Sequence, residues 1–168
     1  MTEPTGTLHT GFSEPGAAAT PWAAAVALLE SAEIYWLSTV RPDGRPHVTP
    51  LLAIWRDDRA YVTTGATERK ARNLAENPAV VLTTGTNRLS AGLDITVEGT
   101  ARRVTDQPLL GRLATDYATK YGQDWAFQPG DGVLEHAEGG AALLFEITPD
   151  RVFGFAKDPY TQTRWDLG

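Results

Sequence analysis

The fold is decided by residues 34–64, IYWLSTVRPDGRPHVTPLLAIWRDDRAYVTT. The first seven of these residues are β-branched and aromatic, which is typical of a strand. The next six predict a tight turn, because Pro42 fixes φ and Gly44 can adopt the positive φ of an Asp-Gly hairpin. A second strand over 47–55, a turn at 57–59 and a third strand over 60–64 complete an antiparallel meander.

Helices and further strands are predicted on both sides of this meander. Thr20 and Pro21 indicate the start of a helix that ends near residue 32. A second helix is capped by Thr67 and stopped by Asn77-Pro78, and a third begins after Asp106 and ends around 121–122. Further strands are expected over 79–84, 93–104, 141–147 and 151–156, the last two forming a hairpin around Thr148-Pro149-Asp150.

The organisation follows from length and local composition. Residues 1–19 are rich in Gly, Thr, Pro, Ser and Ala and predict a flexible tail. Residues 20–168 are expected to form one domain, mainly β, with an antiparallel barrel and peripheral α-helices. The segment 123–140 is Gly-rich and acidic, and is a candidate mobile lid.

Composition narrows the function classes. The sequence lacks cysteine, which excludes disulfides and thiolate chemistry, and its formal charge of −6 argues against nucleic-acid binding. The first twenty residues resemble no secretory signal and no segment is apolar enough to span a membrane, so a cytoplasmic protein is expected. The histidines at 9, 47 and 136 are far apart in unlike contexts, so no metal site is expected. The sequence also lacks the Gly-x-Ser-x-Gly elbow of hydrolases and the glycine patterns of Walker and Rossmann nucleotide-binding motifs.

One segment suits an anion. The strand over 60–64 ends in Thr63 and Thr64, and the following helix begins with Arg69 and Lys70. Hydroxyls at a strand end, free amides at a helix N-terminus and two cations together favour a phosphate. The alternative is a capped surface helix with ordinary solvated charges.

Several motifs, in order, resemble the pyridoxamine 5′-phosphate oxidase-like split β-barrels. They are the strand Leu37–Val40, the stretch DGRPHVTPL over 43–51, and KARNL over 70–74 followed by Asn77-Pro78. ITVEGTARRV over 95–104 is similar to the family's strand with the pattern VxGxAxxV. TQTRW over 161–165 resembles the end of its deazaflavin-linked branch.

The resemblance implies an FMN-binding split barrel that forms a homodimer with cofactors at the subunit interface. The cofactor ring would lie along the second strand, and its phosphate near the end of the third strand and the helix that follows. The C-terminal segment would reach the site from the partner subunit. The residues expected to bind the cofactor are Val48, Thr49, Pro50, Leu51, Thr63, Thr64, Arg69, Lys70, Arg164 and Trp165. A buried terminal anchor is an equal alternative for Trp165, and a solvated charge is the alternative for Arg69.

The activity implied is hydride transfer between coenzyme F420 or FMN and a small planar or conjugated substrate. Vitamin B6 oxidation is not expected, because Asp94 stands where the oxidases proper have a glutamine near the flavin. The TRW ending favours F420, and FMN stays a competitor. One alternative is a non-catalytic protein that binds haem, a tetrapyrrole or a flavin, with His47 as the axial ligand for haem. A dimeric scaffold without redox function is the other.

Overall fold

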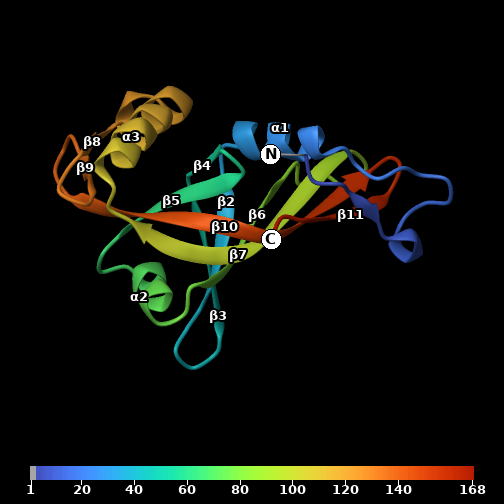
Figure 1. Ribbon diagram of the computed structural model, residues 1–168, viewed down its shortest axis with the longest axis horizontal. Coiled ribbons are helices and arrows are strands. Elements are labelled where there is room, and N and C mark those ends of the chain that lie inside the picture. The colour runs from blue at the N-terminus through green and yellow to red at the C-terminus, as the bar shows by residue number, and fades with distance from the viewer. Residues whose placement is uncertain (1–2) are drawn as a thin grey trace.

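The computed structural model describes residues 3–168 and is mainly an antiparallel sheet with helices at its periphery (Figure 1). The strands are β1 (Thr7–Leu8), β2 (Tyr35–Val40), β3 (Pro46–Leu51), β4 (Ala53–Arg56), β5 (Arg59–Gly65), β6 (Ala79–Gly85), β7 (Gly92–Val104), β8 (Phe127–Pro129), β9 (Leu134–His136), β10 (Ala141–Lys157) and β11 (Thr161–Asp166). The helices are α1 (Trp22–Ser31), α2 (Arg69–Glu76) and α3 (Gln107–Tyr121), with short 3₁₀ turns η1 (Thr10–Phe12) and η2 (Gln123–Trp125).

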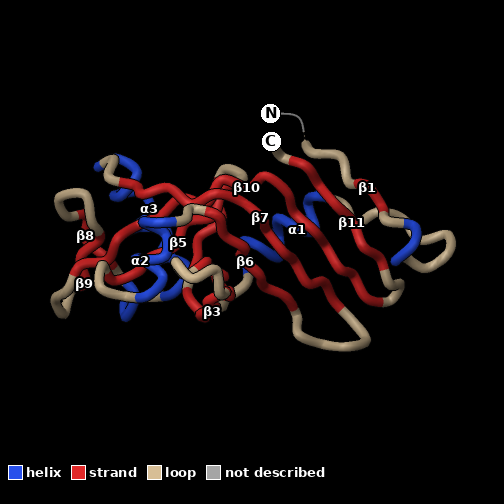
Figure 2. The backbone as a smooth tube through the Cα atoms, turned by 90° about the horizontal axis from the view of Figure 1, so that it is seen from below, coloured by secondary structure: helices blue, strands red, loops and turns tan. Residues whose placement is uncertain are grey.

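The strands form one open sheet whose main path is β1-β11-β10-β7-β6-β2-β3. Two smaller pairs extend from β10: β5 with β4, and β9 with β8. Figure 2 shows the long strands side by side, with β1 and β11 at one end and α3, β8 and β9 at the other. The sequence-based prediction of a mainly β split barrel with peripheral helices is confirmed.

The hairpin predicted around residues 148–150 is wrong. The chain there continues as β10, which pairs with β7 from Leu144 opposite Val104 to Lys157 opposite Gly92. Pro149 cannot donate a ladder hydrogen bond, and the strand absorbs it as a bulge between Pro149 and Arg151. Gly99 makes room for the bulge, because a Cβ there would lie 2.3 Å from the Thr148 carbonyl oxygen. The true hairpin turn follows Lys157 and joins β10 to β11.

The strand predicted over 47–55 is two strands. β3 pairs with β2, whereas β4 pairs with β5, so the chain changes partner at Leu52. This change of partner carries the chain from the outer β2–β3 hairpin to the short β4–β5 pair.

Two predicted loops also contain structure. In the first nineteen residues, of which residues 1 and 2 lie outside the described part, β1 pairs with β11. The segment 123–140 contains η2 and the β8–β9 hairpin, which extends β10 at its beginning. The strands β1, β8 and β9 are too short to give a periodic pattern in the sequence.

The core has two centres. Under α1, Trp22 and Leu29 pack with Trp55 and Trp165 against the long strands. Under α3, Leu110, Leu113 and Tyr117 pack with Phe127 and Leu134. No helix within residues 3–168 is long and apolar enough to cross a membrane. The two centres leave α2, β3 and the end of β5 at the margin of the core, where the candidate site lies.

Candidate functional site

A cavity of about 400 Å³ lies where β3, β5 and the start of α2 meet the β8–β9 region. Its size is within the range of small-molecule sites. Four of the predicted cofactor residues line it: Pro50, Leu51, Thr63 and Thr64. The residues that sequence reasoning missed are Glu68, Trp125, Phe127 and His136, the last three from the segment predicted as a lid. Trp125, Phe127 and His136 gave no signal because that segment has no helical or strand periodicity.

The residues of β3 alternate between two faces. Thr49 lies opposite Leu37 and Leu51 opposite Tyr35, on the inward face. Val48 points outward and is 51% exposed. The four predicted β3 residues therefore divide: Thr49 and Leu51 face inward, whereas Val48 and Pro50 lie on the outer face.

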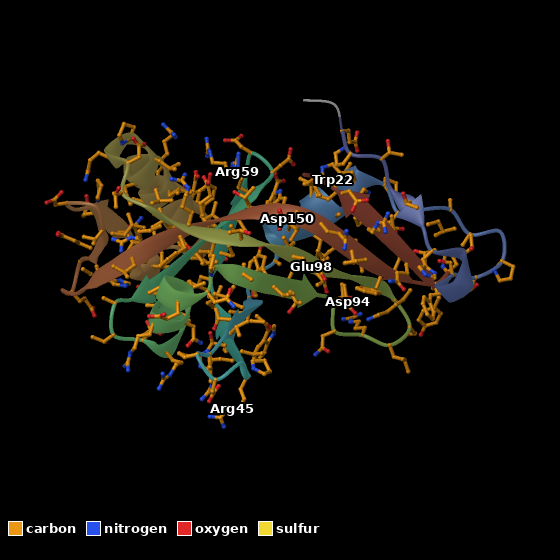
Figure 3. The ribbon with its side chains drawn as sticks, turned by 60° about the horizontal axis from the view of Figure 1, so that its bottom comes forward. Trp22, Arg45, Arg59, Asp94, Glu98 and Asp150 are labelled. Atoms are coloured by element: carbon orange, nitrogen blue, oxygen red, sulfur yellow. The ribbon has the colours of Figure 1, made fainter. Side chains whose placement is uncertain are left out.

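The outer face of β2 and β3 is apolar. Trp36, opposite Pro50 in the ladder, is 50% exposed, and Ile34 just before β2 is 48% exposed. A larger open groove of about 660 Å³ adjoins this face and includes Ile34, Trp36 and Asp94. Asp94, on β7 (Figure 3), is paired with Lys157 at 2.7 Å. We assign the smaller cavity as the candidate site, because it contains the predicted residues and borders α2.

A cluster of cations lies beside the inward face of β3. Burial, followed by the nearby charges of Arg41, Arg69 and Lys70, holds the pKa of His47 below its usual value. The His47 ring lies within 3.5 Å of the Thr39 hydroxyl. Arg69 is exposed and Lys70 is buried. The β2–β3 turn, the beginning of β3 and α2 thus bring positive charge to one place.

Buried polar atoms in this cluster lack partners. Arg41 Nε and Thr49 Oγ1 are buried and make no hydrogen bond within residues 3–168. Unpartnered buried polar atoms are uncommon in proteins and call for an explanation such as a bound group. Arg41 Nε–H and the Thr49 hydroxyl are both donors of the kind that an anion accepts from. By contrast Arg45, at the tip of the β2–β3 turn (Figure 3), is engaged by Asp43 at 2.6 Å.

The KxxN pattern of α2 has a structural explanation. Lys70 and Asn73 are buried one turn apart on the same side of the helix. The Asn73 amide donates to the Thr39 hydroxyl at 2.9 Å and so fixes α2 against β2. Lys70 itself does not line the cavity, but it contacts Glu68, which does.

Glu68 already occupies this end of the site. Its carboxylate accepts from the Gly65 backbone N–H at 2.7 Å and from the Lys70 ammonium. Burial alone would raise the pKa of Glu68, but these hydrogen bonds hold it below its usual value. Glu68 is also the N-cap residue of α2, which corrects the prediction of Thr67. In this structure the Lys70 charge is therefore satisfied by a carboxylate.

The two predicted cofactor residues near the C-terminus, Arg164 and Trp165, lie away from the cavity. Trp165, on β11, is fully buried, and its ring centroid is 5.4 Å from that of Trp22. Within one chain Trp165 is therefore a buried terminal anchor, which is one of the two alternatives that the sequence offered. Arg164 points to the opposite side, exposed and paired with Asp166 at 3.1 Å. Within one chain neither residue lines the cavity.

Two further expectations concern metals and haem. Within residues 3–168 no cluster of three or more His, Asp or Glu side chains suits a metal ion. His47, the axial ligand in the haem alternative, is not among the residues lining the cavity, whereas His136 is. The His136 ring packs against Phe127 with 4.4 Å between centroids. Cations, orphaned donors and an adjoining apolar cavity fit a phosphorylated ring compound.

The architecture is similar to that of several known proteins. Comparison with curated protein sequences gave no match. Similar solved structures include the conserved hypothetical protein Rv2991 from Mycobacterium tuberculosis, with 20% identity, a TM-score of 0.64, and coverage of 88% of this chain and 85% of that one. An F420 reductase is 23% identical with a TM-score of 0.54, covering 75% of this chain and 93% of that one. The heme storage protein HutZ from Vibrio cholerae is 23% identical with a TM-score of 0.59, covering 77% and 89%.

These likenesses, all below 25% identity, establish the fold. The family model described as pyridoxamine 5′-phosphate oxidase matches residues 22–156, which include α1, the cationic cluster and the cavity. The match ends before Arg164 and Trp165. The chain belongs to the pyridoxamine 5′-phosphate oxidase family.

Proposed function

We propose that this protein is an oxidoreductase that binds coenzyme F420 or FMN and transfers hydride between it and a small planar or conjugated substrate. The observation that carries the proposal is the cationic cluster with orphaned donors beside an apolar cavity. The family match and the structural similarity to an F420 reductase support it.

Different residues would bind the phosphate and the ring of the cofactor. Lys70, Arg69 and Arg41 would bind the phosphate, with Thr49 and the hydroxyls of Thr63 and Thr64 as further donors. Pro50, Leu51 and Phe127 offer apolar surface to the ring, and Trp125 would limit access of water. The bound cofactor supplies the hydride chemistry, and the protein supplies orientation and electrostatics.

A homodimer forms part of this proposal. The outer face of β2 and β3 exposes Ile34, Trp36 and Val48, and such apolar surface favours a protein partner. Isologous pairing would cover the face. In the same proposal, the C-terminal strand of the second copy reaches the cavity, so that its Arg164 contacts the cofactor.

Glu68→Gln is expected to tighten cofactor binding about fivefold. The carboxylate of Glu68 competes with the cofactor's phosphate for Lys70, and the amide keeps an oxygen for the Gly65 N–H while removing the charge. In this partly exposed setting the charge is worth about 1 kcal/mol. Titration of both proteins with each cofactor measures the effect. Weaker binding in the variant would show that Glu68 supports the site instead of competing for it.

Catalysis itself is tested by turnover. The protein is mixed with reduced F420 or reduced FMN and a panel of quinone and nitroaromatic acceptors, and reoxidation is followed by absorbance. We expect acceptor-dependent reoxidation at a rate above that without protein. Reoxidation that the protein never accelerates, despite tight cofactor binding, would identify a cofactor-sequestering protein.

A further inference from the structure

His136 is placed in the candidate cavity by the short β8–β9 hairpin. It lies opposite Phe127 in the hairpin ladder, and the two rings pack with 4.4 Å between their centroids. The backbone of His136 is also held, because its N–H donates to the Gly140 carbonyl and its carbonyl accepts from the Gly139 N–H, both at 3.0 Å. The half-buried imidazole lines the cavity, and the proposed function gives it no role.

Both ring nitrogens of His136 are available to a bound molecule. Within residues 3–168 the His47 ring is the one histidine ring that has a hydrogen-bond partner. The contact with Phe127 is between ring faces and edges, so it orients the imidazole of His136 without using a nitrogen. Because Phe127 is also part of the apolar surface offered to the cofactor ring, the imidazole stands next to the place where the reaction would occur.

His136 is one of two titratable side chains among the described residues that line the cavity, and the other is Glu68. Despite burial, hydrogen bonds from Lys70 and a backbone N–H hold the pKa of Glu68 below its usual value, so Glu68 has no proton to give at neutral pH. The hydroxyls of Thr63 and Thr64 donate hydrogen bonds but are too weak as acids. An imidazole exchanges its proton in the physiological pH range, which makes His136 the suitable acid.

Hydride transfer to a conjugated carbonyl compound requires such an acid. The hydride forms a new C–H bond with both of its electrons, and the electron pair of the broken π bond moves to the carbonyl oxygen, directly or through the conjugated system. Without a proton that oxygen stays negative. Most of the cavity wall is apolar, with Ile34, Leu51, Leu52 and Trp125 among its residues, and an unpaired charge in such surroundings is costly.

We propose that His136 is the proton donor of the reaction and recognises the oxygen of a planar conjugated carbonyl compound, an inference that rests on the proposed function. The imidazolium N–H donates to the carbonyl oxygen, and the proton moves to that oxygen as the hydride reaches carbon. The substrate thus gains one hydride, supplied by the reduced cofactor, and one proton, supplied by His136. The neutral imidazole then regains a proton from water. General acid catalysis of this kind contributes about 10²–10⁴-fold to a rate.

The first test measures recognition without turnover. The full chain, loaded with the oxidised cofactor, is titrated by calorimetry with 4-nitrophenolate, whose anionic oxygen imitates the oxygen that becomes negative, and with 4-nitroanisole, in which a methyl group caps that oxygen. In His136→Gln we expect the phenolate to bind about fivefold more weakly and the anisole to bind as before, because glutamine keeps an N–H but loses the positive charge. Equal phenolate affinity in variant and wild type would overturn the proposal.

The second test measures turnover of 2-cyclohexenone with the reduced cofactor. We expect His136→Gln to lower kcat by about 100-fold or more, while the Kd of the cofactor changes by less than about twofold. His9→Gln is the matched control, since the His9 ring also packs against a phenylalanine, with 4.6 Å between its centroid and that of Phe12, but is exposed and does not line the cavity. The kcat of this control should equal that of the wild type.

The outcomes separate this inference from the proposed function. A wild type that binds neither cofactor contradicts the proposed function itself. Normal kcat in His136→Gln, or loss of cofactor affinity in that variant, would overturn the assignment of His136 and leave the proposed function standing. Added imidazole should restore part of the rate in His136→Ala, which a purely structural role does not predict. Turnover of a nitroaromatic acceptor without turnover of the enone would overturn the proposed substrate class.

Discussion

Trp165→Ala is expected to lower the free energy of unfolding by about 3–5 kcal/mol, the usual cost of removing a large buried aromatic side chain. Trp165 is fully buried and packs against Trp22 from α1. Gly154 is shaped around it, because a Cβ there would lie 2.7 Å from the indole ring. The side chain thus joins the C-terminal strand to the helix over the core, and its loss leaves a cavity.

Urea denaturation followed by tryptophan fluorescence and circular dichroism measures this effect. Arg164→Ala is the matched control, because the neighbouring side chain is exposed and its ion pair with Asp166 contributes little. We expect that control to stay within about 1 kcal/mol of the wild type. A Trp165 variant of normal stability that binds no cofactor would instead place the indole in the cofactor site.

Lys70→Ala is expected to weaken binding of the phosphorylated cofactor by about 1.5–3 kcal/mol, which is a rise in Kd of about tenfold to 150-fold. Lys70 is buried and contacts Glu68, which lines the cavity, and a charged hydrogen bond to phosphate is among the stronger polar contacts in proteins. The change leaves Glu68 half-exposed to water, so the fold should tolerate it.

Fluorescence titration of the variant with FMN and with F420 provides the test. Arg72→Ala is the control from the same helix, because the Arg72 guanidinium is exposed and donates to the Thr67 carbonyl at 2.6 Å. Its Kd should change less than twofold. Unchanged affinity in Lys70→Ala would remove Lys70 from the phosphate site and leave only Arg41 and Arg69 there.

Much of the fold could be predicted because its signals are local. The alternation over β2 and the Asp-Gly turn after it are confirmed as the β2–β3 hairpin. Asp106 caps α3 as predicted, accepting from the Leu109 N–H at 2.9 Å. The errors come from non-local effects. Pro149 resembles a turn residue, and only its position opposite Gly99 shows that a long strand can absorb it.

The candidate site was less predictable, since it depends on which residues approach across the sheet. Thr63 and Thr64 were predicted from a local pattern and Pro50 and Leu51 from the family resemblance, and all four line the same cavity. Arg41 and Glu68 were not found, because their importance lies in an unpartnered donor and in a contact with Lys70. His136 reaches the cavity at the end of the β8–β9 hairpin and Trp125 from η2, and both elements are too short to give a sequence signature.

The central claim is that the cationic cluster and cavity bind a phosphorylated flavin or deazaflavin. The most direct test is titration of the apo-protein with FMN and, separately, with F420, followed by cofactor fluorescence. We expect one of them to bind with a Kd well below 0.1 mM and the other to bind much more weakly. If neither binds below about 0.1 mM, where the binding free energy is only about 5.5 kcal/mol, the proposed redox function is contradicted.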